Sequence, residues 1–336
     1  MHQLSSELLL LIEKECRGRK HIKLTIGILR DGEKKIQVFD ETGEIANKNY
    51  TYEIGSITKT FTTSLLAKYL YEGKMSLEDS ISKYVDGLDE NTYYPTLKRL
   101  ATHTSGYGYY PATLLDGIKA FLEPVFTGTR NGGKFLNCYQ INEEQMKELL
   151  LAKKLENKDY PWAYSNFGMG LVSYALGAVT GNGYSDTMND YLGSDLGMKN
   201  SYTGIRSDIN LRGFANKNKD IGNWDFEDSI TAGTGNISST ADDMLTYARI
   251  QMNEELPYLG LCHKKYVSIN NTSDMGLGWI LKKDNNHVIM HTGGTGGFHN
   301  FLVIDKKKKI AYLMLANYLV NLNKFVLTIL NDLEKS

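Results

Sequence analysis

A serine and a lysine three residues apart, in Ser56-Ile57-Thr58-Lys59, have the types and spacing for acyl-transfer chemistry. An apolar run with helical spacing follows over residues 61–70, which places the pair on one face of a first helical turn. There the lysine amine could take the serine proton, and Ser56 would be the nucleophile of a covalent hydrolase or acyl-transferase. The structural alternative is that Ser56 only caps the helix.

The same spacing occurs again at Ser80-Ile81-Ser82-Lys83, so spacing alone does not identify a nucleophile. Ser80 follows the polar residues 78–79 and is predicted to be a cap or an exposed position. Ser56 differs because Gly55 precedes it and a strong helix follows. Its amide is therefore expected at a helix N-terminus, where the partial positive charge favours an anion.

A tyrosine is the second expected component of the site. Lysine acts as a base only when its amine is neutral, which burial can bring about. A tyrosine close by could then pass the proton to a leaving group, and Tyr164-Ser165-Asn166 supplies one in a Tyr-x-Asn pattern that occurs nowhere else in the chain. The structural alternative is a packed tyrosine followed by an asparagine that caps a loop.

A glycine-rich segment, His291-Thr292-Gly293-Gly294 and on to residue 297, is the third component. It ends a predicted strand and is too rich in glycine to be a central strand itself. Glycines allow close backbone approach, so a carbonyl held at this edge could place its oxygen between the N–H groups of Ser56 and Gly294, forming an oxyanion hole. The alternative is a glycine-rich hairpin or bulge with an incidental histidine.

The elements that must position these residues are strands at both ends of the chain and helices between them. The pattern predicts helices at 5–16, 146–155, 168–179, 241–252 and 321–333, and strands at 21–30, 35–39, 278–281, 287–291, 298–304 and 310–315. We therefore expect an α/β (α+β) chain with a discontinuous sheet domain, residues 1–55 and 265–336, and a mainly helical domain, residues 56–264. The cleft between two such domains is the expected place for the active site.

Composition limits the partners. The chain has 336 residues, 41% of them hydrophobic and 23% charged, with a net charge of -1, so there is no basic field for nucleic acid. No segment has the roughly 18 apolar residues of a membrane span. The expected partner is a small-molecule or short-peptide substrate, and neither metal nor cofactor is called for. Nothing in the chain indicates an oligomeric state.

The expected location is cytoplasmic. The three cysteines show no disulfide or metal spacing. The apolar residues 8–12 lie between two glutamates and are too short for a signal peptide, although an exported protein trimmed of its signal would look the same.

Three rival sites are weaker. Residues 128–134 fit the first seven positions of a phosphate-binding P-loop, but Phe135 stands where Ser or Thr is needed. His103 and His291 could serve a Ser-His-Asp hydrolase, yet the chain has no Gly-x-Ser-x-Gly motif, and His103 is predicted to have a structural hydrogen-bonding role. A metallohydrolase would need His-Glu-x-x-His or a comparable cluster, which the chain lacks.

Taken together, the three motifs resemble the serine β-lactamase and penicillin-binding-protein superfamily, in which they occur in this order. The chain is most similar to the class C-like branch, with its β-lactamases, DD-carboxypeptidases, D-aminopeptidases and esterases. Further stretches resemble segments of that branch, at residues 100–106, 231–244, 276–279 and 314–317. The resemblance extends over about residues 22–317.

The resemblance implies a β-lactamase/DD-peptidase-like fold and a role for each residue. Ser56 would be acylated, and Lys59 and Tyr164 would form the general acid/base pair. The remaining residues would hold the substrate: Asn166 at its amide, and His291, Thr292 and Gly293 along the strand edge. The N–H groups of Ser56 and Gly294 would form the oxyanion hole.

One departure bears on the substrate. Class C β-lactamases usually have lysine where this chain has His291, and a histidine there is more like the DD-peptidases and D-aminopeptidases of the branch. The resemblance therefore implies a D-amino-acid peptide or amide first, a short-chain ester second and a β-lactam third. A non-catalytic protein that binds peptide or β-lactam is the alternative of a different class. The irregular residues 106–142 are expected to shape specificity.

Overall fold

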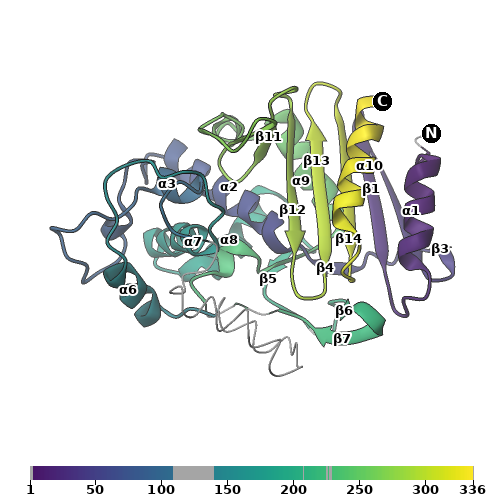
Figure 1. Ribbon diagram of the computed structural model, residues 1–336, viewed down its shortest axis with the longest axis horizontal. Helices are drawn as coiled ribbons and strands as arrows, with labels where there is room; N and C mark the ends of the chain where they lie inside the picture. Colours follow the sequence, from purple (N-terminus) through teal and green to yellow (C-terminus); the bar gives the residue numbers. More distant parts are fainter. Residues whose placement is uncertain (1–2, 109–139, 207, 225, 227–228, 336) are drawn as a thin grey trace.

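The computed structural model describes residues 3–108, 140–206, 208–224, 226 and 229–335 (Figure 1). The chain opens with α1 (Ser6–Cys16), which Ser5 caps by accepting a hydrogen bond from the Leu8 N–H. A hairpin of β1 (Leu24–Arg30) and β2 (Glu33–Asp40) follows, and then the short strands β3 (Gly43–Ile45) and β4 (Thr51–Glu53).

The main sheet joins the two ends of the chain. Within the described residues it has nine strands in the order β3-β2-β1-β14-β13-β12-β11-β10-β9, and every pairing is antiparallel. The C-terminal strands are β9 (Val267–Ser268), β10 (Ser273–Met275), β11 (Ile280–Lys282), β12 (Val288–Gly294), β13 (His299–Asp305) and β14 (Ile310–Ala316). The N-terminal and C-terminal strands are joined by the pairing of β1 with β14, which runs from Leu24 opposite Ala316 to Arg30 opposite Ile310.

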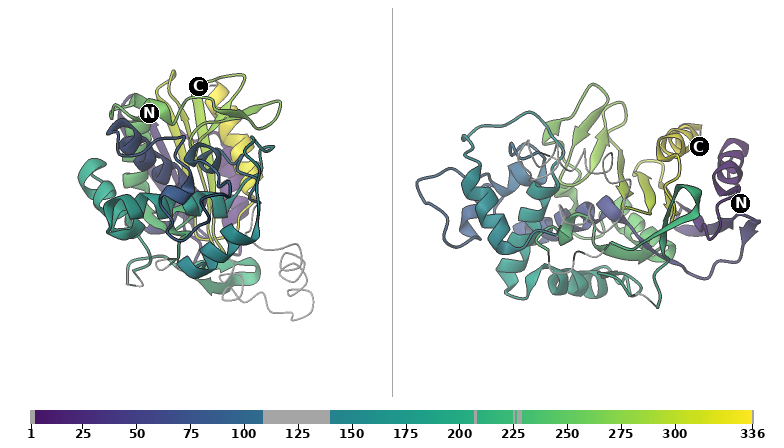
Figure 2. Two further views of the ribbon diagram at one scale, coloured as in Figure 1. Left: turned by 90° about the vertical axis from the view of Figure 1, so that its left-hand side faces the viewer. Right: turned by 60° about the horizontal axis from the view of Figure 1, so that its bottom comes forward.

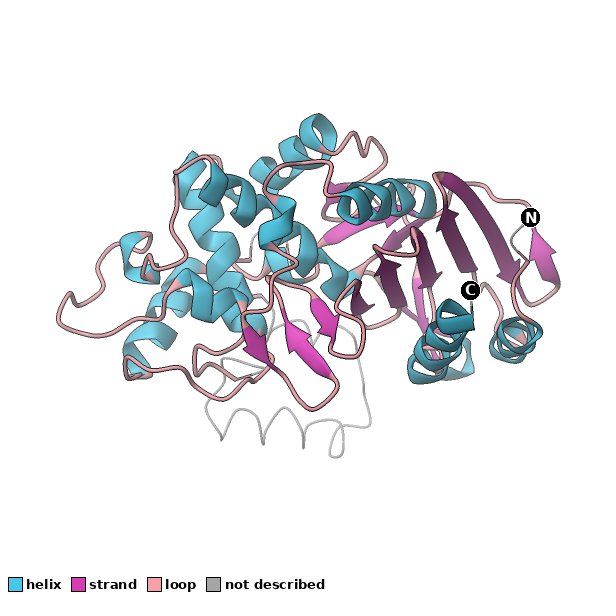
Figure 3. Cartoon of the chain, turned by 90° about the horizontal axis from the view of Figure 1, so that it is seen from above, coloured by secondary structure: helices cyan, strands magenta, loops and turns pink. Residues whose placement is uncertain are grey.

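Helices cover both faces of this sheet. Seen from above, α1 and α10 (Leu322–Lys335) lie on one face and α9 (Ala241–Asn253) lies on the other (Figure 3). Side chains of a strand alternate between faces, so Phe301 and Val303 pack with the terminal helices while Leu302 and Ile304 join the core on the side of α9. Burial on both sides explains why β13 and β14 read as nearly continuous apolar runs.

The other half of the molecule is mainly helical and lies to the left in Figure 1. Its helices are α2 (Thr58–Tyr71), α3 (Leu97–Ala101), α6 (Glu143–Ala152), α7 (Asn166–Thr180) and α8 (Gly183–Asp190), with a π-helical turn at Tyr191–Asp195. A small sheet in the order β4-β8-β5 contains β5 (Tyr202–Thr203) and β8 (Ile237–Thr240), while β6 (Gly213–Ala215) and β7 (Lys219–Gly222) form a hairpin. The views in Figure 2 show the helical half from two other sides.

Helix α2 is buried on nearly every side. The apolar spacing of residues 61–70 predicts one buried face, but Thr60, Thr62 and Thr63 are fully buried as well. Their hydroxyls donate to backbone carbonyls, as in the bonds from Thr62 Oγ1 to Gly233 O at 2.7 Å and from Thr63 Oγ1 to Leu277 O at 2.9 Å. These bonds satisfy the polar groups that burial would otherwise leave unpaired, and they hold α2 rigidly at the centre of the molecule.

The predicted fold class is confirmed, because an antiparallel sheet covered by terminal helices stands beside a mainly helical half. The predicted strand at 287–291 is too short, since β12 runs on to Gly294 with Gly293 opposite Asn300. The middle of the chain also holds short strands that the pattern missed. The division into residues 1–55 with 265–336 and 56–264 stays a prediction. No helix in the described part of the chain is long and apolar enough to cross a membrane.

Candidate active site

Ser56 lies where β4 turns into α2. Gly55 has φ +54°, a left-handed conformation that favours glycine, and it starts the 3₁₀ turn Gly55–Ile57 that carries Ser56. Helix α2 then begins at Thr58, two residues later than the motif suggests. Lys59 lies in the first turn of α2, three residues after Ser56, and residues i and i+3 share a face where a 3₁₀ turn continues into a helix.

Lys59 is fully buried and contacts the serine. Its Nζ donates to Ser56 Oγ at 2.9 Å and to the backbone oxygen of Thr234 at 2.8 Å. Burial lowers the pKa of the Lys59 amine well below its usual value. Once neutral, the amine can keep an N–H on Thr234 O and accept the proton of the Ser56 hydroxyl on its lone pair, as a general base must.

Tyr164 lies against Lys59 and between two histidines. The Lys59 Nζ is 5.0 Å from the centre of the Tyr164 ring. The ring centres of His103 and His291 are 4.6 Å and 6.5 Å from that of Tyr164. The structure therefore brings the predicted residues Ser56, Lys59, Tyr164 and His291 together, although they come from distant parts of the chain.

His291 is held in one tautomer. Its Nδ1 lies 2.6 Å from the backbone oxygen of Thr292, which can only accept, so the proton of the neutral ring belongs on Nδ1. Burial, with a smaller contribution from Lys59, lowers the pKa of His291 to about 4 despite the bond to Thr292. The ring is therefore neutral near pH 7 and offers a lone pair on Nε2, whereas a lysine would offer a charge.

The two candidate N–H donors of the oxyanion hole are brought together by backbone contact. A Cβ on Gly55 would lie 2.6 Å from Gly294 N, and one on Gly293 would lie 2.0 Å from Ile54 O. Both distances are too short for any side chain, so the end of β12 packs directly on the turn that carries Ser56. The Ser56 and Gly294 amides consequently belong to two adjoining backbone segments.

The remaining predicted residues, Asn166 and Thr292, are neighbours in the sequence of Tyr164 and His291. Asn166 is buried at the first position of α7, two residues after Tyr164, and Ser165 caps that helix. Strand alternation places Thr292 on the opposite pleat from His291 and Gly293. The contact that links Thr292 to the site is its carbonyl oxygen.

A family comparison covers nearly the whole chain. A protein-family model described as Beta-lactamase matches residues 17–334. The chain belongs to the beta-lactamase family. Its homologues are serine hydrolases.

Curated relatives of this family member are distant in sequence. The D-alanyl-D-alanine-carboxypeptidase/endopeptidase AmpH of Escherichia coli K12 is 27% identical over 286 residues, which cover 76% of this chain and 68% of AmpH. Protein flp of Staphylococcus aureus MW2 is 23% identical over 291 residues, covering 81% of this chain and 54% of flp. The chain thus spans only about half of flp.

Among solved structures, a class C beta-lactamase superposes with a TM-score of 0.77 at 20% identity, covering 97% of both chains. A D-stereospecific amidohydrolase from Streptomyces sp. gives a TM-score of 0.72 at 19% identity, covering 96% of this chain and 98% of that one. Identities this low establish the shared fold alone.

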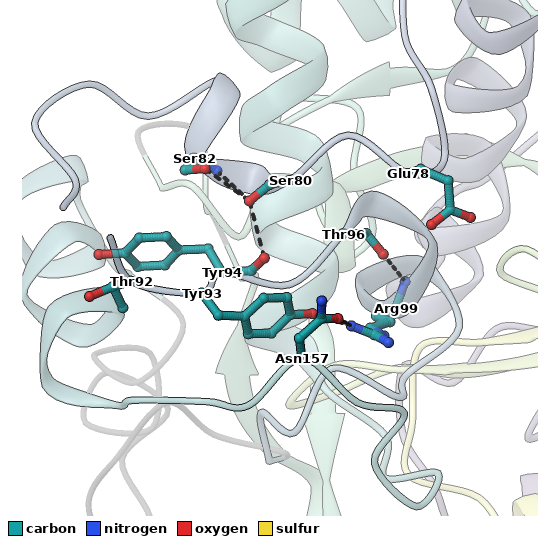
Figure 4. Close-up of a pocket in the computed structure, with 9 residues that line it drawn as sticks. All are labelled: Glu78, Ser80, Ser82, Thr92, Tyr93, Tyr94, Thr96, Arg99 and Asn157. Carbon is teal, nitrogen blue, oxygen red and sulfur yellow. Dashed lines mark hydrogen bonds between the residues drawn. The ribbon is translucent and has the colours of Figure 1, made fainter. Parts of the chain in front are cut away.

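A cavity of about 440 Å³ lies elsewhere on this beta-lactamase family member, around Ser80 and Arg99 (Figure 4). Arg99 donates to Asp159 and Asn157 at 2.8 and 2.7 Å and contacts the Tyr93 hydroxyl, so these neighbours engage its guanidinium. None of the residues predicted for the Ser56 site lines this cavity.

One contributor to the site is not predicted from the sequence. The Thr234 carbonyl lies in residues 231–244, which resemble a segment of the family, but a backbone oxygen leaves no residue signature. His103, predicted to have a structural hydrogen-bonding role, accepts hydrogen bonds from the Ala163 and Ser165 N–H groups. The P-loop-like residues 128–134 and most of the irregular residues 106–142 lie outside the described residues. In the described part of the chain no cluster of three or more His, Cys, Asp or Glu could hold a metal ion.

Proposed function

We propose that the protein is a serine hydrolase that forms an acyl-enzyme on Ser56 and acts on a D-amino-acid peptide or amide. The observation that carries the proposal is the 2.9 Å contact between Ser56 Oγ and a fully buried Lys59 amine whose pKa is lowered. A lysine in solvent would be charged at neutral pH and could not accept a proton.

The proposed reaction has two halves. Ser56 Oγ attacks the substrate carbonyl while its proton passes to Lys59, and the negative charge on the carbonyl oxygen is stabilised by the N–H groups of Ser56 and Gly294. Tyr164 gives a proton to the leaving amine, which departs as the ester to Ser56 forms. Lys59 then passes its proton to Tyr164, which restores both groups. A water molecule adds to the ester and gives one proton to Lys59, which passes it to Ser56 Oγ as the acid is released.

Substrate binding is proposed along the edge of β12. The strand runs from Val288 to Gly294, and β11 pairs with it only as far as Met290. A peptide-like substrate could extend along His291, Thr292 and Gly293, with its amide oriented by Asn166. Main-chain hydrogen bonds of this kind give affinity without demanding one particular side chain.

A D-amino-acid substrate is the first choice for two reasons. His291 is neutral and offers an acceptor on Nε2, which differs from the charge that a lysine would supply to a β-lactam carboxylate. The relative AmpH is also a D-alanyl-D-alanine carboxypeptidase/endopeptidase. A cytoplasmic location stays a prediction, and it would favour small peptides or amides over an assembled cell wall.

The test combines active-site labelling with a substrate panel. A fluorophosphonate should add one equivalent to the wild-type protein, detected by intact mass spectrometry, and none to Ser56→Ala. D-alanyl peptides and D-amino-acid amides should be turned over faster than p-nitrophenyl esters, and nitrocefin slowest.

Two outcomes would overturn parts of the proposal. Esters or nitrocefin as the best substrates would retain the serine hydrolase and replace the substrate. A protein that binds a D-peptide or β-lactam reversibly, with neither labelling nor turnover, would be the non-catalytic binder.

A further inference from the structure

His103 holds the chain on both sides of Tyr164. Its backbone oxygen accepts a hydrogen bond from the Ala163 N–H at 2.9 Å, and its Nδ1 accepts one from the Ser165 N–H at 3.2 Å. The residues immediately before and after Tyr164 are therefore fixed by a single residue. The adjoining Thr104 O accepts from the Tyr160 N–H at 3.1 Å, which extends the same contact along the loop.

The imidazole of His103 also packs on the rings of this loop. Its centre is 4.6 Å from that of Tyr164, and the ring of Trp162 meets it edge-on at 6.1 Å. The residue is 1% exposed. His103 thus contacts Tyr164 through its ring as well as through the neighbouring backbone.

The protonation state of His103 follows from these contacts. Because Nδ1 accepts from a backbone N–H, it carries no proton, and the neutral ring has its hydrogen on Nε2. Burial, with smaller contributions from Lys59 and His291, lowers the pKa of His103 to about 3. A proton on Nδ1 would face the Ser165 N–H and break the bond that holds it.

The backbone of His103 is unusual in a way that pairs with this role. Its φ of +61° is in the left-handed region, which is uncommon for residues other than glycine, although asparagine, aspartate and histidine adopt it more readily than most. Its Nε2 is buried without a hydrogen-bond partner among the described residues. Strained backbone conformations persist where the surrounding structure requires them and cluster at functional sites, and an unpaired buried polar atom calls for an explanation.

We propose that His103 is a positioning residue for Tyr164. The neutral imidazole of His103 holds the Tyr164 hydroxyl in the position from which it exchanges a proton with the substrate. The inference rests on the proposed function in that Tyr164 is the acid of the reaction. It goes beyond the hydrogen-bonding role expected from the sequence, because loss of the imidazole should change the chemical step and not merely stability.

Two substitutions separate the side chain from the backbone. His103→Gly accepts the positive φ without strain, keeps the carbonyl that binds Ala163, and removes the ring and the Nδ1 acceptor. His103→Asn tolerates the same φ and restores an acceptor near the position of Nδ1. The matched control is His263→Asn, since His263 has a side chain only 2% exposed and bonds to Glu254 and Gln251 rather than to the site.

Kinetics are measured per active site, with the number of sites titrated by fluorophosphonate, so that unfolded protein does not count. We expect His103→Gly to lower kcat about 10- to 100-fold and to change KM less than about threefold. The kcat of His103→Asn should lie within about fivefold of the wild-type value, and that of the His263→Asn control within about twofold. In a Tyr164→Phe background the His103→Gly change should cost less than about twofold more, because both changes remove the same function.

A measurement that needs no activity keeps this inference separate from the proposed function. With 3-fluorotyrosine at position 164, the ¹⁹F spectrum should show one narrow resonance in the wild type and in His103→Asn, and a broadened or split one in His103→Gly. ¹⁵N-histidine spectra of the wild type should show the Nε2–H tautomer of His103 at neutral pH, and they decide the matter if His103→Gly does not fold.

Contrary results are equally definite. The inference is wrong if Nδ1 of His103 is protonated in the wild type, or if His103→Gly leaves the ¹⁹F resonance and the per-site kcat unchanged. It is also wrong if the loss from His103→Gly is as large in the Tyr164→Phe background as in the wild type. A wild-type protein that turns over nothing, yet shows the expected ¹⁹F response, would refute the proposed function and leave the positioning role standing.

Discussion

The chain contains the same Ser-x-x-Lys spacing twice, and only one copy has the surroundings of a reactive site. At Ser56 the lysine is fully buried, contacts the serine and donates to a backbone carbonyl. At Ser80 the serine caps a 3₁₀ turn and donates to Tyr94 O at 3.1 Å, while Lys83 has a side chain 55% exposed and pairs with Asp79 at 2.9 Å. A carboxylate stabilises an ammonium ion, whereas burial favours the neutral amine.

The largest expected difference between the two copies is in the serines. Ser56→Ala should abolish both fluorophosphonate labelling and turnover, because no other oxygen occupies the position over Lys59. Ser80→Ala should leave both unchanged and lower the free energy of unfolding by about 1 kcal/mol, the usual effect of losing an N-cap. Labelling is measured by intact mass spectrometry and stability by urea unfolding. A label on the Ser56→Ala variant would show that Ser56 is not the labelled nucleophile.

The lysines should differ next. Lys59→Met retains the length and apolar stem of the side chain while removing the base, so kcat should fall about 10²- to 10⁴-fold with the protein still folded. Lys83→Met removes only an exposed ion pair and should change kcat less than about twofold. Circular dichroism confirms folding, and near-normal turnover by Lys59→Met would exclude it as the base.

A close contact at Gly293 tests whether the backbone around Ser56 and Lys59 is as important for turnover as the two side chains. In Gly293→Ala the new Cβ would lie 2.0 Å from Ile54 O, so β12 must shift relative to Ser56, and a displacement of about 1 Å can cost about 10²-fold in rate. Gly193→Ala is the control, because a Cβ there meets nothing within 4 Å. Equal per-site kcat values for the two variants would show that this contact does not position the site.

The smallest effect is the response of stability to pH, which the two regions should show in different ranges. Burial is the main reason why the pKa of His103 is about 3 and that of His291 about 4. Both values are below the pKa of 6.5 of a histidine in the unfolded chain. Between these values the unfolded chain binds more protons, so stability rises with pH, and each histidine should cost about 2 kcal/mol on going from pH 7.5 to 5.

Near Ser80 the sign is the same, because stability again falls as the pH falls, but the pH range is lower. Burial would raise the pKa of Asp79, but hydrogen bonds from Tyr84 and Lys83 leave it lowered, so its contribution to stability is lost only as the pH falls below about 4.

The prediction for His103 is tested by urea unfolding at pH 7.5 and pH 5. The free energy of unfolding should fall less between these pH values for His103→Asn than for the wild type. An identical fall in both proteins would mean that His103 is not held neutral by the fold.

The sequence predicted the residues that act through side chains better than the surroundings that make them reactive. The order of the motifs led to Ser56, Lys59, Tyr164 and His291, and the structure brings these four together. The Thr234 carbonyl could not be foreseen, since every residue has one and only the fold decides which of them meets the Lys59 amine.

The fold was predictable where patterns are long and was not where they are short. The main strands and α1, α7, α9 and α10 follow from apolar spacing, with ends that differ by a few residues. The strands β4, β5 and β8 have two to four residues, too few for a period to register. Burial of α2 on all sides was hidden because Thr60, Thr62 and Thr63 read as polar, although tertiary contacts satisfy their hydroxyls.

The pairing of β1 with β14 has a consequence for how the protein is made. During synthesis β1 and β2 leave the ribosome well before the partner of β1, residues 310–316, because the two strands are distant in the sequence. Until β14 has been synthesised, one edge of β1 is open to other chains, which is an aggregation hazard. Contacts this distant in sequence also form slowly, so recovery of labelling at Ser56 during refolding should follow the late closure of this sheet.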